Sequence, residues 1–413
     1  MTLFTLISFR QFFRDITRQK LRTVLTVVGI FWGTVSVILL FAVGKGLHEM
    51  VVKQSKGLGD RISIVWPGVT SQGWKGMPPG RRIRYTEDDV LAIKEKSELI
   101  SAISVEYRGG STTMRYETNT ASSSFSGVWP EYGDMRNVLP KAGGRFLNIR
   151  DLEEKRRVVF LGFEVAEKLF EKEDPVGKEV YIERSPFLVI GVMQKKEQNS
   201  SYSGRDKDKG FIPSTTYMAM KTRRYPSNFV FQSRLGVEMK DAISDVHRVL
   251  APRHGYDPSD TKALSIWDTT EGDNFWNIFF IAFRSFLLVI GCFTLITGGI
   301  GVANIMNVVV QERTKEIGIK IALGAHKRMV MMQFFTEGLF LVAIGGALGF
   351  GFAYAVVVLV GNSGLTEYVG VPNIDTFGVV LTISVLSLTG LLAGVFPARR
   401  AANMQPVEAI KLF

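Results

Sequence analysis

Residues 312–325 have the types and spacing that most clearly indicate a chemical task, and that task is recognition of a partner. Their charged members are Glu312, Arg313, Lys315, Glu316 and Lys320, and their apolar set is Ile317, Ile321 and Leu323. A short amphipathic helix of this composition can insert into a groove of another protein. Gly324 offers an end for such a helix. The alternative is a mere interfacial turn between two membrane segments, which would explain the basic residues but not the acids.

Catalytic and metal-binding patterns do not occur in the sequence. It contains no Gly-x-x-x-x-Gly-Lys-Ser/Thr stretch, which is the loop that cradles nucleotide phosphates. The histidines, at positions 48, 247, 254 and 326, have no metal-ligand spacing with each other or with Cys292. No nucleophile stands with a base in a recognisable constellation. We therefore predict no catalytic residue, no metal site and no cofactor in this chain.

Four apolar segments must position residues 312–325. They cover 23–43, 285–310, 338–360 and 377–396, and each has about the 20 residues that a helix needs to cross a hydrocarbon core. A cleaved secretory signal is the alternative for the first segment. Its apolar run exceeds the usual ~7–15 residues, and no small-x-small cleavage site follows it. The amphipathic stretch is thus predicted to connect the second and third spans.

Basic residues beside the spans predict the orientation. They precede the first span, lie between the second and third, and follow the fourth: Arg10, Arg14, Arg18, Lys20, Arg22, Arg313, Lys315, Lys320, Lys327, Arg328, Arg399, Arg400 and Lys411. Because such residues stay on the cytoplasmic side, both termini are predicted inside the cell, in a multi-pass protein of the inner (cytoplasmic) membrane. The net charge of +11 is then assigned to anionic lipid headgroups and not to nucleic acid.

Three parts are predicted along the chain. Residues 1–45 hold an N-terminal helix lying in the membrane interface, with Leu6, Phe9, Phe13 and Ile16 on one face, and the first span. Residues 46–275 form an extracytoplasmic domain with stalk helices, and 276–413 hold the other three spans and a short tail. The predicted fold class is therefore a membrane α-helical protein of four transmembrane helices, with a large α+β domain inserted between the first and second.

Short strands and helices alternate in the extracytoplasmic domain. Strands are predicted over 61–66, 103–107, 123–128, 158–161, 178–182, 187–192 and 263–267, and helices over 86–96, 164–170 and 240–250. The polar stretch 194–210 suggests a boundary between two subdomains near 195–210. The second subdomain would hold 211–213, the last helix and the last strand.

Small residues and one acid stand out inside the spans. Gly345, Gly346, Gly349, Gly390 and Gly394 permit close helix packing, either within one chain or between two copies. Glu337 lies about one turn inside the third span, and an acid at that depth is a functional candidate. Its place near the inner edge favours a structural role at the interface.

The order of these motifs resembles the MacB and FtsX-like family of ABC transporter permeases. The resemblance rests on residues 304–325, on Phe396-Pro-Ala-Arg-Arg400 with its continuation to Ile410, and on three stretches of the domain: 127–132, 144–146 and 169–178. It covers nearly the whole chain. Ile321 departs from the pattern, because the family often has a second basic residue there.

The resemblance implies a permease subunit without enzymatic activity that works by mechanotransmission. A separate ABC ATPase, binding ATP and Mg²⁺, would push a coupling helix formed by Glu312, Arg313, Lys315, Glu316, Ile317, Gly318, Lys320, Leu323, Gly324 and Ala325. A second permease copy, in a homodimer or a heterodimer, would complete the membrane part, with a periplasmic adaptor, an outer-membrane channel and membrane lipid as further partners. Substrate would be exported from the periplasm.

Two alternatives remain at this point. A lipoprotein-releasing or hydrolase-activating complex of the FtsX-like type would use the same mechanics on another cargo. A membrane-anchored sensor or adhesion protein would need no ATPase. The acids at Glu312 and Glu316 argue against that second alternative, because a sensor needs no groove-binding helix between its spans.

Overall fold

The computed structural model describes residues 20–196, 198, 201–366 and 370–403. The chain divides into two compact units. We call Val51–Trp276 the core domain, and Met1–Met50 with Asn277–Phe413 the membrane unit. The predicted N-terminal interfacial helix and residues 404–413 of the C-terminal motif lie outside the described residues.

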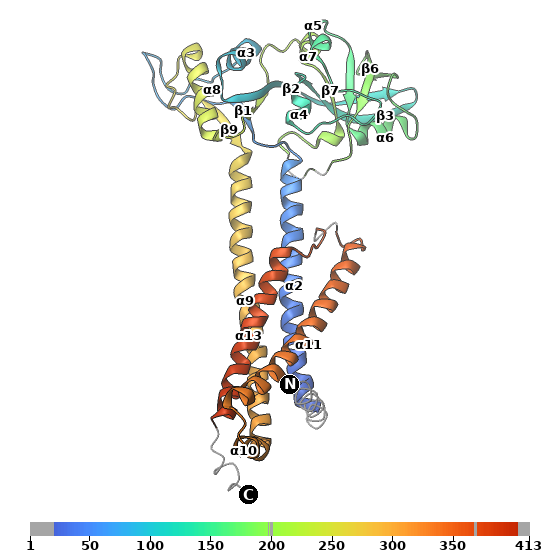
Figure 1. Ribbon diagram of the computed structural model, residues 1–413. Helices are drawn as coiled ribbons and strands as arrows, with labels where there is room; N and C mark the ends of the chain where they lie inside the picture. Colours follow the sequence, from blue (N-terminus) through green and yellow to red (C-terminus); the bar gives the residue numbers. More distant parts are fainter. Residues whose placement is uncertain (1–19, 197, 199–200, 367–369, 404–413) are drawn as a thin grey trace. The chain divides into compact units, whose positions relative to one another are not determined.

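Four long apolar helices confirm the four predicted spans. They are α2 (Lys20–Lys56), α9 (Thr269–Glu312), α11 (Lys327–Gly361) and α13 (Thr376–Ala402) (Figure 1). The 44 residues of α9 make a helix about 66 Å long at 1.5 Å per residue. That length exceeds the ~30 Å of a hydrocarbon core, so α9 continues beyond the bilayer, as predicted for a stalk.

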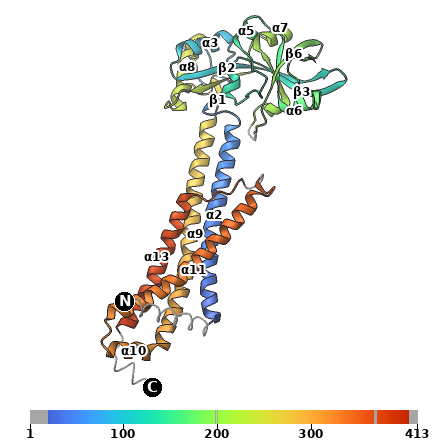
Figure 2. The ribbon, with the colours of Figure 1, turned by 45° about the vertical axis from the view of Figure 1, so that its right-hand side comes forward.

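Glycines let the helices of the membrane unit approach closely. A Cβ atom on Gly345 would lie 2.9 Å from Ile30 Cβ, and one on Gly349 would lie 2.8 Å from the carbonyl oxygen of Phe31, so these two glycines seat α11 against α2. The other three lie where α11 and α13 pack side by side (Figure 2): Gly346 against Leu386, Gly390 against Val342, and Gly394 against Phe335. All five glycines therefore pack within one chain.

The core domain is built on a mixed sheet in the order β3-β7-β4-β6-β5-β2-β8-β1-β9. Its strands are β1 (Ile62–Pro67), β2 (Ile100–Tyr116), β3 (Asn119–Val128), β4 (Val158–Leu161), β5 (Glu179–Ile182), β6 (Ser185–Val192), β7 (Lys209–Pro213), β8 (Asn228–Ser233) and β9 (Leu264–Asp268). Two pairs, β3–β7 and β4–β6, are parallel, and the others are antiparallel.

Helices cover this sheet and complete the predicted α+β fold. They are α3 (Glu87–Lys96), α4 (Tyr132–Met135), α5 (Ile149–Glu153), α6 (Phe163–Phe170), α7 (Ser214–Lys221) and α8 (Met239–His254), with a short 3₁₀ turn, η1 (Asp206–Asp208). Apolar residues of α3, α6, α7 and α8 share one buried cluster with β2 and β8. A second cluster contains Ile62, Ile64, Phe160 and Phe211. In Figure 1, α3 and α8 lie together at one end of the domain and α6 lies at the other.

Two features of the sheet differ from the sequence-based expectation. Residues 211–213 were expected to join the second subdomain, but β7 pairs with β3 and β4, and the chain passes to the other half of the sheet only after α7. Strand β8 was not predicted, although it is central and pairs with both β1 and β2. Both differences concern which distant strands pair, and local composition does not encode that pairing.

Asp89 gives the core domain an acid-sensitive contact between α3 and α8. Its carboxylate accepts hydrogen bonds from Arg253 Nε at 2.5 Å and pairs with His254 Nε2 at 3.0 Å. Burial alone would raise the pKa of Asp89, but the hydrogen bonds with His254 and Arg253 outweigh burial and lower that pKa well below its usual range. The ionised form is therefore stabilised in the folded state, and this stabilisation is lost progressively as the pH falls below the ordinary Asp pKa of about 4 toward the lowered pKa of the folded protein.

We expect Asp89→Asn to lower the free energy of unfolding at pH 7 by roughly 1.5–3 kcal/mol, the contribution of hydrogen bonds to a charged group. Urea unfolding of the whole detergent-solubilised chain between pH 3 and pH 7 measures it. The difference from the wild type should shrink below about pH 4. A difference that stays constant over this range would contradict the assignment to Asp89.

Candidate functional site

The connection between the second and third spans is a short helix with defined ends. Helix α9 ends at Glu312, Arg313 interrupts the helical geometry with φ −93° and ψ 10°, and α10 runs over Thr314–Ala322. Gly324, at φ +93°, closes the end of α10, where the amide of Ala325 donates to the carbonyl of Lys320 at 3.0 Å. A left-handed residue that terminates a helix in this way favours glycine.

The inward face of α10 is apolar and buried. Ile317 is 3% exposed and belongs to a cluster with Val310, Val330 and Phe334, against which Ile321 also packs. Gly318 is buried beside Ile317. This face therefore holds α10 against the ends of α9 and α11, and it is not available to a partner.

A polar network fixes the same side of α10. Arg313 Nη1 donates to the two carboxylate oxygens of Glu337 at 3.2 and 3.3 Å, and the two side chains are 10% and 7% exposed. Gln333 Nε2 donates to Glu337 Oε1 at 3.1 Å, and Lys320 Nζ donates to Gln333 Oε1 at 3.4 Å. We call these four residues the α10–α11 clamp. Glu337, the intramembrane candidate, is thus one partner of a buried ion pair.

The outward face of α10 is where a partner can bind. Ile319 is 45% exposed and Leu323 is 83% exposed, and with Lys315 they form a stripe at four-residue spacing. Glu316 is exposed beside this stripe, and Glu312, Gly324 and the half-buried Ala325 lie at its two ends. Two large apolar side chains flanked by charges of both signs make a surface suited to an amphipathic groove.

Sequence reasoning misassigned part of this surface. It grouped Ile317, Ile321 and Leu323 as one inserting set, but the structure turns the two isoleucines inward. Leu323 lies two residues beyond Ile321, which is about 200° around a helix of 3.6 residues per turn. These side chains therefore cannot share one face. Ile319, which was missed, takes their place on the outside, and its spacing of four from Leu323 was the signal that could have revealed it.

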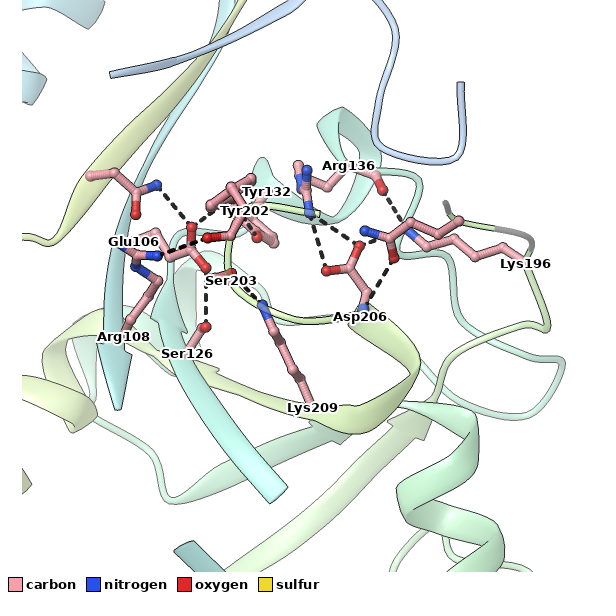
Figure 3. Close-up of polar contacts among 12 residues, drawn as sticks. Glu106, Arg108, Ser126, Tyr132, Arg136, Lys196, Tyr202, Ser203, Asp206 and Lys209 are labelled. Atoms are coloured by element: carbon pink, nitrogen blue, oxygen red, sulfur yellow. Dashed lines mark hydrogen bonds and ion pairs between the residues drawn. The ribbon is translucent and has the colours of Figure 1, made fainter. Parts of the chain in front are cut away.

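A second group of polar residues lies buried in the core domain (Figure 3). Asp206 is fully buried and accepts hydrogen bonds from Arg136 Nη2 at 3.1 and 3.2 Å and from Lys196 Nζ at 2.8 Å. Arg136 is itself only 1% exposed, and its guanidinium lies 4.9 Å from the ring centre of Tyr202. These contacts fix η1 to the turn that follows α4.

Glu106 on β2 is the second buried acid of this group. It accepts hydrogen bonds from the hydroxyl groups of Tyr202 at 2.6 Å and Ser126 at 3.1 Å, and from Asn228 Nδ2 at 2.8 Å. The Tyr202 ring packs edge-on against Trp66, with ring centres 5.7 Å apart. Together with the Asp206 contacts, these bonds hold residues 201–208 against the sheet. We call the set Glu106, Arg136, Lys196, Tyr202, Asp206 and Lys209 the ionic network.

Charges balance one another inside the ionic network. Burial alone would raise the pKa of Asp206, but Arg136, Lys196 and Lys209 outweigh burial and lower that pKa. Burial lowers the pKa of Lys196 and of Lys209, against the opposing pull of the nearby carboxylates. No group of three or more His, Cys, Asp or Glu that could hold a metal occurs in the part of the chain that the structure describes. Because the buried carboxylates of the ionic network are paired with cations or hydrogen-bond donors, we assign the network a structural role.

Comparison with known proteins gives the chain its family. Residues 23–249 match the MacB-like periplasmic core domain, and residues 288–406 match the FtsX-like permease C-terminal domain. The chain belongs to the MacB/FtsX-like permease family. Its place in that family and its four apolar helices make it a multi-pass membrane protein with a core domain of α+β fold between the first and second spans.

Curated relatives resemble the chain over nearly its whole length. The macrolide export ATP-binding/permease protein MacB of Wolinella succinogenes is 33% identical over 405 residues, which cover 96% of this chain and 59% of that protein. The protein of the same name from Chlorobaculum tepidum is also 33% identical, over 97% of this chain and 60% of its own length. The chain thus spans about 60% of the length of these curated relatives.

A solved structure also resembles the chain. The periplasmic region of MacB from Actinobacillus actinomycetemcomitans covers 55% of this chain at 18% identity, with a TM-score of 0.43, and the match covers 96% of that structure.

Proposed function

We propose that this chain is the transmembrane subunit of a MacB-type ABC transporter and works by mechanotransmission. A separate ATPase subunit, which binds ATP and Mg²⁺, would dock on α10 and drive the extrusion of substrate from the periplasmic side. The core domain would then lie in the periplasm, and both termini in the cytoplasm, as the distribution of basic residues indicates. A second copy of the chain, a periplasmic adaptor and an outer-membrane channel complete the proposed assembly.

The outward face of α10 carries this proposal. Ile319, in the middle of α10, and Leu323, directly after it, are exposed, while Ile317 and the Arg313–Glu337 pair fix the other face of α10 to the membrane unit. The exposed apolar stripe is the docking contact, and the fixed inner face lets a bound partner move the helix as a body. A sensor or adhesion protein would have no use for such a stripe between two spans.

Leu323→Asp is expected to reduce recovery of the ATPase at least about tenfold. Docking would bury Leu323 as an apolar anchor, and an aspartate in its place would bring an unpaired charge into the interface. Losing such an anchor typically costs about 2 kcal/mol or more of binding free energy. The measurement is an affinity pull-down of the tagged chain from detergent-solubilised native membranes, with mass spectrometry of the recovered proteins. Ile319→Asp and Glu316→Lys should act in the same direction.

The matched control is Leu235→Asp, because Leu235 is 86% exposed on the core domain and Leu323 is 83% exposed. The control should recover as much ATPase as the wild type. Equal recovery with Leu323→Asp would contradict docking through α10. Recovery of no protein with a phosphate-binding loop by a well-folded wild type would contradict the proposed function as a whole.

A further inference from the structure

The α10–α11 clamp ties the docking helix to the third span more firmly than to the second. Between α9 and α10 stands a single residue with non-helical geometry, Arg313. The backbone of such a residue can absorb a change in the angle between the two helices. On the side of α11, the Arg313 guanidinium and the Glu337 carboxylate meet at 3.2 Å with both side chains largely buried. Gln333 and Lys320 add a second tie one turn away.

The apolar contacts of α10 and the Arg313–Glu337 ion pair respond differently to force. The apolar cluster around Ile317 includes residues of both α9 and α11, and apolar side chains can re-pack with a modest loss. A buried ion pair has one favourable arrangement, because separating it leaves an uncompensated charge away from water. A push on α10 therefore displaces α11 before it breaks the clamp.

We propose that the Arg313–Glu337 pair is the positioning element that makes the third span move with the docking helix. This inference rests on the proposed function, because it takes the push from an ATPase on α10. It specifies the route that the motion takes through the membrane unit. The third span moves first, and its contact with α2 at Gly345 and Gly349 and its contact with α13 at Gly346 pass the displacement on.

The test measures an ATP-dependent distance in the whole assembly. The chain, with its native Cys292 replaced by serine, is reconstituted with its ATPase in lipid nanodiscs. Spin labels are attached at Leu359→Cys near the end of α11 and at Phe286→Cys on α9, two positions that are 73% and 60% exposed. Labelled copies are diluted with unlabelled copies so that only distances within one chain are recorded, with and without ATP.

Glu337→Gln is expected to lose at least half of the ATP-dependent change in distance while ATPase recovery stays within about twofold of the wild type. Glutamine keeps the size of the side chain and removes the charge. Arg313→Gln combined with Glu337→Gln removes both charges of the pair and so leaves neither unpaired. This double variant should unfold at the wild-type temperature and still lack the ATP-dependent change in distance. The reversed pair, Arg313→Glu with Glu337→Arg, should restore at least part of it.

The remaining outcomes distinguish a failure of the role of the Arg313–Glu337 pair from a failure of the proposed function. A wild-type change in Glu337→Gln, or in the double glutamine variant, would overturn the role of the pair while leaving the proposed function intact. The same would follow if Glu49→Gln, which removes an exposed acid of α2, lost the change equally. If the wild type bound no ATPase, the proposed function would fall, and this inference with it.

Discussion

We expect Asp206→Ala to lower the free energy of unfolding by about 3–5 kcal/mol, which is the usual cost of removing one partner of a buried ion pair. Arg136, 1% exposed, and Lys196 would both lose their carboxylate. Urea unfolding of the whole chain, followed by tryptophan fluorescence, measures the loss. Trp66 and Trp267 both contact the Tyr202 ring, so the signal also reports release of residues 201–208.

Two variants make this result specific. Glu154→Ala removes an exposed acid that pairs with Arg156 at 2.7 Å, and a surface pair of this kind contributes about 0–1 kcal/mol. Arg136→Met and Lys196→Met combined with Asp206→Leu replace all three paired charges by apolar groups and should recover at least half of the loss, because such replacements are often nearly neutral. Equal losses in Glu154→Ala and Asp206→Ala would show that burial of the network contributes nothing.

The second large effect is expected at Gly349, where a side chain would force α2 and α11 apart. A Cβ there would lie 2.8 Å from the carbonyl oxygen of Phe31 and 2.8 Å from Thr34 Cβ, and a backbone atom cannot rotate away. Overpacking of this kind costs about 1–3 kcal/mol and occasionally more. We expect Gly349→Val to lower the unfolding temperature of the detergent-solubilised chain and the fraction that stays monodisperse on heating.

Gly351 provides the control on the same helix. A Cβ at that position would meet no atom within 4 Å, so Gly351→Val should change stability by no more than about 0.5 kcal/mol. If both variants lost the same amount, the cause would be the valine in the helix and not the contact with α2.

The membrane part was predictable because its signals are local. A run of about 20 apolar residues predicts a span wherever it occurs, and all four spans were found in this way. Alternation, turn residues and the acids of the first turn likewise located α3, β4 and the β5–β6 pair. Strand β8 and the partners of β7 were missed because pairing between distant strands depends on the whole sheet.

The candidate site was predictable in its position but not in its orientation. The mixed charges of 312–325 predicted a short helix between the second and third spans, which α10 confirms, but the sequence did not show that Arg313 turns inward to Glu337, 24 residues later. The ionic network left no local signal, because Glu106, Arg136 and Asp206 are far apart along the chain and each is an ordinary charged residue in its own surroundings. Only the folded sheet brings them together.

The core domain begins and ends on neighbouring strands. Ser63 of β1 is paired with Asp268 of β9, and the hydroxyl of Thr269 donates to the carbonyl of Ile62 at 2.8 Å. A domain whose two ends are adjacent can be inserted into, or removed from, a host chain with little disturbance of either part. The 51–276 segment therefore has the geometry of an inserted domain, which a host chain can accept or lose as a unit.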